Sequence, residues 1–501
     1  MLEACKLLFN LWNDQGIRYC HWKSNEHLLE GLNGETDLDV YVCPQDKELA
    51  ETLLKKTHYL ESVTQKGGRY PNVSEWMGFD RSTGKLVHIH LHYKIITGTK
   101  YCKEYVFPVE DLMISTRVLD LSTNVYVTDP NLEIIILYSR IALKAARKKE
   151  ISIDKSDRCE IDFLKSKIQK DKVAYLCNQL LGGNGKAFNL LLEKNELSTS
   201  EWYKVYLFAY NWLKPYRKYS KIHVFFRHYY FYLRGIIILI ANNKFDCFFI
   251  NKKTLPGRSI SICFLGQDGS GKSTVTIELC KWLSWKLAAH RFYLGSGDHY
   301  NGLLKRLISR GSKIKHRNDK QDKVNDTVTA EPIKQKKKKK NFKNFFPAVL
   351  LAANRLNVAR RAYKEVLKAD KYLKKGGIPL FDRFPQTQYD GIYDGPKIAE
   401  SYRESGLDYY VIKKMAAIER KYIKKIEKYQ PGLVFKLMLP PEESIRRKPF
   451  EDIVAVTRKH EITKNLQFPN SVVHTIDATQ NYQQEILIIK NIIWDSLSQC
   501  H

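Results

Sequence analysis

Short apolar runs and longer segments with a helical period alternate through the second half of the chain. Ser259–Leu265 (SISICFL) is a short, β-rich apolar run typical of a buried strand, and Thr274–Leu287 has apolar residues at helical spacing. The residues between them are rich in glycine. The pattern therefore predicts a strand, a glycine turn and a helix in succession.

The same alternation continues toward the end of the sequence. Pro347–Gly377 has the pattern of a long helix that stops at a glycine, and Ile378–Phe384 that of an apolar strand. Gly432–Leu439 and Val473–Asp477 predict two further strands, and Gln483–Trp494 predicts a terminal helix. Strands that alternate with helices predict an α/β fold in which helices flank a parallel sheet.

Residues 1–125 mix short strands and helices and predict an α+β domain. Leu2–Gln15 has the pattern of an amphipathic helix, and Asp37–Val42 alternates like a half-buried strand. Met77–Asp80 and Leu86–His92 flank a polar turn and predict a hairpin.

Residues 126–255 predict a helical connecting region that is dense in aromatic and basic residues. Its most apolar part is VFFRHYYFYLRGIIILI, Val224–Ile240. Arg227 and Arg234 interrupt this stretch, which disfavours a membrane span. We expect its aromatic face to pack between domains, with a position in a membrane surface as the alternative.

The amino-acid composition is typical of a globular protein. A chain of 501 residues with 44% hydrophobic and 27% charged residues is expected to form two or three domains. The ten cysteines show no metal-binding spacing, and Asp14 and Arg18 interrupt the first apolar stretch, so no signal peptide is expected. These features predict a cytoplasmic protein with reduced thiols, or one associated with the inner face of the membrane.

The charge balance is unusual. The chain has 83 Lys and Arg against 54 Asp and Glu, a formal net charge of +29, which predicts anionic partners or reflects a lysine-rich bias. Within residues 256–501, the stretch Leu303–Lys343 is lysine-rich without hydrophobic periodicity. It predicts a mobile insertion that is simply solvated or that binds a polyanion or membrane.

The glycine turn carries the strongest chemical motif. GQDGSGKST has the spacing of a phosphate-binding P-loop, whose backbone N–H groups curl around one anion. Lys272 is expected to reach the β- and γ-phosphates of ATP, and the hydroxyl of Ser273 to bind Mg²⁺. The predicted nucleotide-binding residues of the loop are Gly266, Gln267, Asp268, Gly269, Ser270, Gly271, Lys272, Ser273 and Thr274.

A second motif follows the long helix. Asp382 and Arg383 stand at the end of the apolar strand Ile378–Phe384, and Arg355 lies in the helix before it, in the sequence ANR. A carboxylate at the carboxyl end of a parallel strand beside the P-loop strand is positioned to hold Mg²⁺ and its waters.

The order of these motifs resembles the thymidylate kinase family of nucleoside monophosphate kinases over about residues 256–501. The resemblance implies that Asp268 lies near the phosphoryl acceptor and that Arg355 clamps the acceptor's phosphate. It implies that Asp382 and Arg383 organise the metal and stabilise transition-state charge. Pro440–Lys459, with Arg446 and Arg447, resembles the lid that closes over ATP.

Two departures from that family fall on the acceptor side. Leu351 occupies the position of a phenylalanine that stacks on thymine, and Leu294–Tyr300 (LGSGDHY) replaces an arginine-bearing loop. The ATP side shows no departure. The acceptor is therefore left open between a nucleoside monophosphate such as dTMP and a phosphorylated sugar or glycan.

The first domain carries a separate motif. In GETDLDVYV, Asp37 and Asp39 are two residues apart on one strand, so they share a face, as two carboxylates that bind Mg²⁺ ions must. This resembles the polymerase-β-like nucleotidyltransferase superfamily. That superfamily takes a third carboxylate from a later strand, but here the candidate strand LVHIHLHY carries His88, His90 and His92.

Three interpretations of this domain follow. The first is a competent transferase, and the second a degenerate domain that only binds a nucleotide or sugar phosphate. The third is a histidine metal site or a purely structural strand. Asp80, across the predicted turn, is the nearest acid in the sequence.

The motifs together favour an ATP- and Mg²⁺-dependent phosphotransferase that acts on a phosphorylated small molecule or glycan. Chains with this domain order resemble predicted proteins of bacterial surface-polysaccharide clusters. The alternatives are a nucleotidyltransferase whose N-terminal domain is the catalyst, or an ATP-switched binding module. A homodimer is left open, and no sequence-specific nucleic-acid binding is expected.

Overall fold

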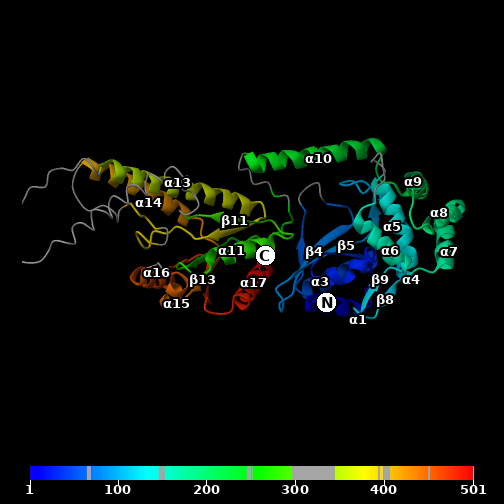
Figure 1. Ribbon diagram of the computed structural model, residues 1–501, viewed down its shortest axis with the longest axis horizontal. Coiled ribbons are helices and arrows are strands. Elements are labelled where there is room, and N and C mark those ends of the chain that lie inside the picture. The colour runs from blue at the N-terminus through cyan, green and yellow to red at the C-terminus, as the bar shows by residue number, and fades with distance from the viewer. Residues whose placement is uncertain are drawn as a thin grey trace, which may run out of the picture. The chain divides into compact units, whose positions relative to one another are not determined.

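The computed structural model describes residues 1–64, 69–145, 153–244, 250, 252–295, 345–392, 395–398, 407–449 and 452–499 (Figure 1). The chain divides into two compact units, which are described separately. Unit 1 comprises Met1–Arg258, Lys286–Ala288 and Leu487–His501, and unit 2 comprises Ser259–Trp285 and Ala289–Ile486. The predicted insertion Leu303–Lys343 lies outside the described residues.

Unit 1 contains a seven-stranded mixed sheet in the order β3-β4-β5-β2-β1-β9-β8. Two of its pairs are parallel, β2 with β5 and β1 with β9. The strands are β1 (Tyr19–His21), β2 (Asp37–Val42), β3 (Leu60–Ser62), β4 (Val73–Phe79), β5 (Leu86–His92), β8 (Val118–Asp120) and β9 (Val125–Val127). A separate hairpin pairs β6 (Ile96–Thr97) with β7 (Tyr105–Val106).

The alternation of side chains along β2 gives this sheet two apolar faces. Leu38 and Val40 belong to a core with α1 (Glu3–Asp14), α2 (Leu28–Leu32) and α3 (Lys47–Lys56). Tyr41, on the other face, belongs to a second core that is formed with helices from α5 onward. The sheet is thus covered on both sides, and unit 1 is α+β as predicted.

Helices make up the predicted connecting region. They are α5 (Pro130–Ala145), α6 (Lys155–Lys165), α7 (Lys170–Leu181), α8 (Gly185–Leu192), α9 (Thr199–Leu213) and α10 (Lys221–Lys244); the short helix α4 (Glu110–Thr116) precedes them. Of the helices in the described part of the chain, α10 alone is long and apolar enough to cross a membrane. Unlike α5, most of its side chains are exposed.

Unit 2 is built on a five-stranded parallel sheet in the order β11-β12-β10-β13-β14. The strands are β10 (Ile262–Gly266), β11 (Ala289–Tyr293), β12 (Ile378–Asp382), β13 (Leu433–Met438) and β14 (Val472–Asp477). The strand order reverses at β10, which has β11 and β12 on one side and β13 and β14 on the other. Ligands of open α/β sheets bind at such a point, beyond the carboxyl ends of the strands.

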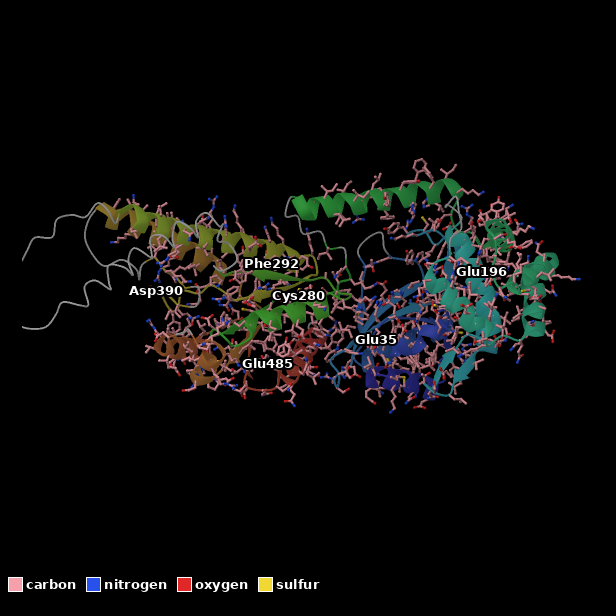
Figure 2. All side chains as sticks on the ribbon, in the orientation of Figure 1. Glu35, Glu196, Cys280, Phe292, Asp390 and Glu485 are labelled. Atoms are coloured by element: carbon pink, nitrogen blue, oxygen red, sulfur yellow. The ribbon has the colours of Figure 1, made fainter. Side chains whose placement is uncertain are left out.

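Helices connect and cover these strands. They are α11 (Lys272–Leu283), α13 (Phe345–Lys374), α14 (Leu407–Glu427), α15 (Pro441–Arg447) and α16 (Ile453–Asn465). Helix α17 (Tyr482–Gln499) begins in unit 2, but its residues from Leu487 on belong to unit 1. Phe292 of β11, labelled in Figure 2, contacts the rings of Phe381 in β12 and Tyr372 in α13. The mixed α/β fold class is therefore confirmed, with a parallel sheet flanked by helices in the C-terminal half.

Two predicted elements differ in extent from the structure. The helix expected from Thr274 begins earlier, at Lys272, because the last glycine of the loop is its N-cap. The lid-like segment Pro440–Lys459 contains α15 and the first half of α16. Pro449 explains the break, since a proline disfavours helical geometry in the residue before it.

Asp80 is a structural turn residue and is not a third carboxylate of the Asp37–Asp39 pair. It is 1% exposed, and its Oδ1 accepts hydrogen bonds from the backbone N–H groups of Ser82 (3.1 Å) and Thr83 (3.0 Å) and from both hydroxyls. These bonds close the turn between β4 and β5. The acid that is nearest in sequence to the histidine strand therefore does not supply the third carboxylate.

We expect Asp80→Ala to lower the free energy of unfolding by about 2 kcal/mol, because it removes the buried carboxylate that accepts the hydrogen bonds of the turn. Urea unfolding followed by circular dichroism measures this loss. Asp14→Ala, at an exposed carboxylate of the same unit, is the control and should change stability by less than about 0.5 kcal/mol. Equal effects of the two substitutions would contradict the assignment.

Candidate functional site

The glycine-rich loop joins β10 to α11 in the predicted strand–turn–helix arrangement. Two of its glycines require the left-handed region, Gly269 at φ 87° and Gly271 at φ 82°. Gly266 is restricted by space, because a Cβ there would meet the carbonyl oxygen of Leu437 at 2.7 Å. Glycine is therefore needed at these three positions for physical reasons, and the loop directs the N-terminus of α11 toward its concave side.

Lys272 is held under the loop. It is 7% exposed, and its Nζ donates a hydrogen bond to the carbonyl oxygen of Gln267 at 2.6 Å. Burial and the nearby charge of Arg383 lower the pKa of Lys272 to about 8. A desolvated ammonium next to another cation gains free energy when an anion binds beside it.

Asp382 lies at the carboxyl end of β12, directly opposite Phe264 of the loop strand β10. Its side chain is fully buried, and its Oδ2 accepts a hydrogen bond from Arg291 Nη2 at 2.7 Å. Its other oxygen, Oδ1, is buried and has no hydrogen-bond partner among the described residues. Since a buried carboxylate oxygen is normally paired, this atom is available to a ligand of positive charge.

The oxygen donors fit a magnesium ion. Besides Asp382 Oδ1, the first turn of α11 offers the exposed hydroxyl of Ser273. Mg²⁺ prefers a few protein oxygen ligands together with waters and phosphate oxygens. The two residues predicted to hold Mg²⁺ therefore have the chemistry that the ion needs.

Asp268 in the loop is surrounded by cations. Lys459 of α16 forms an ion pair with Asp268 Oδ2, and Arg383 Nη2 lies 3.6 Å from Oδ1. Burial alone would raise the pKa of Asp268, but Lys459, Lys272 and Arg383 hold it below its usual value. Asp268 thus stays ionised and holds two cations at the mouth of the loop.

Arg383 has a strained backbone. Its φ is 77°, which is uncommon for a residue other than glycine, and its N–H donates to the carbonyl oxygen of Phe264 at 3.2 Å. Strain of this kind persists where the surroundings impose it, often at functional sites.

Helix α15 contacts the loop from the other side. Ser444 Oγ donates to the carbonyl oxygen of Asp268 at 2.6 Å, and Arg447 Nη2 donates to that of Ala478 at 3.1 Å. Arg447 Nη1 lies 3.5 Å from the carbonyl oxygen of Gly269. Arg446 instead pairs with Glu443 through two hydrogen bonds and is 79% exposed, so it lies away from the loop.

A cavity of about 240 Å³ lies beyond the ends of β11 and β12. Arg355 and Leu351 of α13 line it, together with Leu294 after β11 and Pro385, two residues after Arg383. Arg355 Nη1 donates to the carbonyl oxygen of Lys397 at 2.6 Å. The predicted acceptor arginine and the leucine that replaces the stacking phenylalanine therefore share one cavity.

Glu419 of α14 forms part of the same cavity wall. Its Oε2 accepts hydrogen bonds from the backbone N–H groups of Lys397 (3.1 Å) and Ile398 (3.0 Å). Burial raises the pKa of Glu419. The carboxyl group holds the segment that carries Lys397 against the cavity, and Val358 and Ala362 add apolar surface to its lining.

Most of the predicted C-terminal site residues come together in unit 2. The loop, Lys272, Asp268, Asp382 and Arg383 form one cluster, and Arg355 lies in the adjoining cavity. Sequence reasoning missed Arg291, Lys459 and Glu419. Each belongs to a strand or helix whose charges look solvated in sequence, and only the packing of that element turns the side chain toward the site.

The other predicted pair, Asp37 and Asp39, lies in unit 1 and shares one face of β2. Burial alone would raise the pKa of both groups, but hydrogen bonds and charges from His88, His90, His92 and Lys23 hold it below the usual value. Burial lowers the pKa of His88 and of His92 to about 4. The acid that approaches this cluster is Glu75 of β4, not Asp80, because the antiparallel register places Glu75 opposite His90.

Comparison with known proteins gives distant relatives. No family model matches the chain. It is 26% identical over 225 residues to the uncharacterized ATP-binding protein YghR of Escherichia coli (strain K12), which covers 44% of this chain and 82% of YghR. It is 27% identical over 233 residues to the uncharacterized ATP-binding protein YghS of the same strain, covering 44% of this chain and 86% of YghS.

Among solved structures, the chain matches a deoxyadenosine kinase from M. mycoides with bound dATP. The TM-score is 0.25 at 15% identity, over 47% of this chain and 98% of the kinase. A likeness this loose carries no weight by itself. The α/β fold of unit 2, with its P-loop, is assigned from its own strand order and loop geometry, and the nucleotidyltransferase resemblance of unit 1 gains no support.

The low pKa of Lys272 predicts a proton linkage. At pH 8.5 a triphosphate such as ATP should take up as much as about one proton on binding, because the anion raises the pKa of the buried amine. At pH 7 the amine is already charged, so the uptake through this group should be small. Affinity should therefore fall as the pH rises above about 8.

Isothermal titration calorimetry in buffers of different ionisation enthalpy measures this uptake. Lys272→Arg is the matched control, since a guanidinium stays charged and should bind without the extra proton. The same uptake at pH 8.5 in both proteins would assign the proton to another group.

Proposed function

We propose that this protein is an ATP- and Mg²⁺-dependent P-loop kinase of the thymidylate kinase class. It transfers the γ-phosphate of ATP to a phosphorylated small-molecule acceptor. The observation that carries the proposal is that Arg383 links the two halves of the site. It contacts Asp268 of the phosphate loop and stands two residues before Pro385 of the arginine-bearing cavity.

The donor side has the groups that a nucleoside triphosphate needs. The N–H groups of the loop and of the α11 N-terminus are placed to bind phosphate oxygens, and Lys272 supplies a buried positive charge. Asp382 and Ser273 would hold Mg²⁺, which neutralises charge on the β- and γ-phosphates. The relatives YghR and YghS, which are named as ATP-binding proteins, support this half of the proposal.

For the transfer itself, the protein has to position the two substrates and supply positive charge. An oxygen of the acceptor phosphate forms a bond to the γ-phosphorus while the bond from that phosphorus to the β–γ bridging oxygen breaks, and ADP leaves. Negative charge spreads over the transferred group at that point. Arg383 and Lys459, which Asp268 holds at the loop, would stabilise this charge, and Arg447 would contribute from the lid helix α15.

The cavity indicates the class of acceptor. Arg355 and Lys397 provide cations for a phosphate, whereas Val358, Ala362 and Leu351 provide apolar walls. Leu351 cannot stack on a base as an aromatic ring does. The acceptor is therefore a nucleoside monophosphate held without aromatic stacking, or a phosphorylated sugar or glycan end.

An acceptor screen with labelled γ-phosphate tests the proposal. We expect transfer to at least one nucleoside monophosphate or sugar phosphate, and a loss of about a hundredfold or more in Lys272→Ala. The double variant Asp37→Asn/Asp39→Asn should keep the activity. Arg355→Lys should lower kcat/KM for the acceptor by about tenfold or more while the KM for ATP stays nearly constant.

Other outcomes assign a different function. Activity that survives Lys272→Ala but is lost in the double aspartate variant would make unit 1 a nucleotidyltransferase and unit 2 its regulator. ATP binding without turnover on any acceptor would make the chain an ATP-switched binding module.

A further inference from the structure

A cluster of histidines and carboxylates lies outside the kinase site, on the central strands of unit 1. The parallel register of β2 and β5 places Asp37 opposite His88 and Asp39 opposite His90. His92 follows on the same face of β5. Three imidazoles thus meet two carboxylates on one face of the sheet.

The potential ligand atoms point toward one another. His88 Nδ1 lies 2.8 Å from Asp37 Oδ1, and His92 Nε2 lies 3.1 Å from Asp39 Oδ1. The ligand atoms of Asp37, His88 and His90 lie within 4.8 Å of one another. Those of Asp39, His90 and His92 do the same, so His90 belongs to both groups.

Each of the three histidines has one buried ring nitrogen without a hydrogen-bond partner among the described residues. In His90, which belongs to both groups, this atom is Nε2. It lies 4.0 Å from Asp37 Oδ2 and 3.8 Å from Glu75 Oε1, too far for a hydrogen bond. Two ligands of one zinc ion, each about 2.0–2.2 Å from the metal, are separated by roughly 3.2–3.6 Å. Small movements would therefore admit an ion.

The donor set selects the kind of ion. Imidazole nitrogens mixed with carboxylates suit Zn²⁺ and related transition metals, whereas Mg²⁺ prefers oxygen ligands in octahedral geometry. This differs from the sequence expectation of Mg²⁺ at Asp37 and Asp39. Each carboxylate of the cluster already pairs with a lysine, and these positive charges compete with a bound cation. The pairs are Lys23 with Asp39 (2.9 Å), Lys286 with Asp37 (2.6 Å) and Lys253 with Glu75 (2.5 Å).

We propose that unit 1 binds one zinc-class divalent cation through three ligands, His90 together with either Asp37 and His88 or Asp39 and His92. Asp37 and His90 are 29% and 26% exposed, so the ion would keep a position open to water. Three protein ligands with one open position are typical of catalytic rather than structural zinc.

Metal binding to the full chain tests this site. After dialysis against a chelator, the protein should bind one equivalent of Zn²⁺, as measured by calorimetry and elemental analysis. Added Co²⁺ should give visible d–d absorption of a low-coordinate site. His90→Ala should weaken Zn²⁺ binding about a hundredfold or more.

Three controls make the result specific. His223→Ala, at an exposed histidine of α10, should bind like the parent, and so should Lys272→Ala in the kinase site. Circular dichroism checks that His90→Ala is folded, and His90→Gln is the second variant if it is not. Undiminished Zn²⁺ binding in a folded His90 variant, no stoichiometric binding, or displacement of Zn²⁺ by equal Mg²⁺ would each overturn the proposal.

Helix α10 carries a second, independent inference. One side of it packs on the β6–β7 region of unit 1. Val224 is 2% exposed and accepts a hydrogen bond on its carbonyl oxygen from Cys102 Sγ, and Arg227 Nε donates to the carbonyl oxygen of Tyr101 at 3.1 Å. Phe231 contacts the ring of Tyr101 at 5.8 Å. These contacts hold the first half of the helix along the unit.

The other side of α10 is apolar and exposed. Eleven large apolar side chains between Ile222 and Ile240 are each 39–70% exposed. At 100° per residue they cover about half of the helix circumference. Their exposed area is on the order of 1,000 Å², above the roughly 300–600 Å² of the largest apolar patch on a typical monomer.

The charges next to this face point to its occupant. Lys221–Lys244 contains no Asp or Glu, and Arg234 and Lys221 lie at the two borders of the apolar arc. An apolar half-cylinder with tyrosines and a cationic border is the pattern of a helix that lies in an anionic membrane interface. The chain's net charge of +29 also favours binding to an anionic surface.

We infer that α10 inserts its exposed face into the surface of an anionic lipid bilayer and lies in the membrane plane. The contacts of Val224, Arg227 and Phe231 with unit 1 would be broken if the helix crossed the bilayer. The kinase would thereby be held at a membrane surface.

Flotation with vesicles of phosphatidylcholine, with and without phosphatidylglycerol, tests this inference on the full chain. We expect binding that requires the anionic lipid and falls at least about tenfold in Phe226→Asp/Ile237→Asp. Leu121→Asp, at an exposed leucine elsewhere in unit 1, should bind like the parent.

Light scattering of the same proteins separates the other occupants. A parent protein that ignores vesicles but forms a dimer lost in the double variant would assign the face to a second copy. A monomer that ignores vesicles would assign it to unit 2 of the same chain. Vesicle binding that survives the double variant would move the contact to another basic segment. Each of these results overturns the inference.

Discussion

The parallel pairing of β10 with β12 is the constraint on which the proposed kinase site depends. It sets Phe264 opposite Asp382, so the chain leaves both strands at the same edge of the sheet. The glycine loop follows one strand and Arg383 follows the other, which brings together residues that are far apart in the sequence. Neither the buried Lys272 nor the buried Asp382 could be held there by local structure alone.

Positive charge then accumulates at this edge. Lys272, Arg383 and Lys459 lie around Asp268, and Arg447 approaches the loop from α15. Burial makes this arrangement costly, as the lowered pKa of Lys272 shows. A polyphosphate with Mg²⁺ would relieve that cost, so the same electrostatics that disfavour the free site favour its ligand.

In unit 1, a parallel strand pair also brings distant side chains together, but the ligand atoms differ. The parallel pairing of β2 with β5 sets Asp37 and Asp39 opposite histidines, and the next strand adds Glu75 opposite His90. Carboxylates alone would favour Mg²⁺. The imidazoles change the preference toward a softer ion, although the sheet geometry is the one that a carboxylate pair requires.

The sequence by itself determined the strands β10, β12, β13 and β14, the long helix α13 and the P-loop of unit 2, because glycine spacing and apolar periods are local properties. It did not predict β11 or α14. It also placed Asp37 and Asp39 on one face, since that follows from the strand period. Only the tertiary structure showed that Arg446 faces away while Arg447 and Lys459 reach the loop, and that Glu75 replaces Asp80. These depend on how one element packs against another. A lysine or glutamate on a solvated-looking helix or strand gives no sequence signal of the neighbour that it will contact.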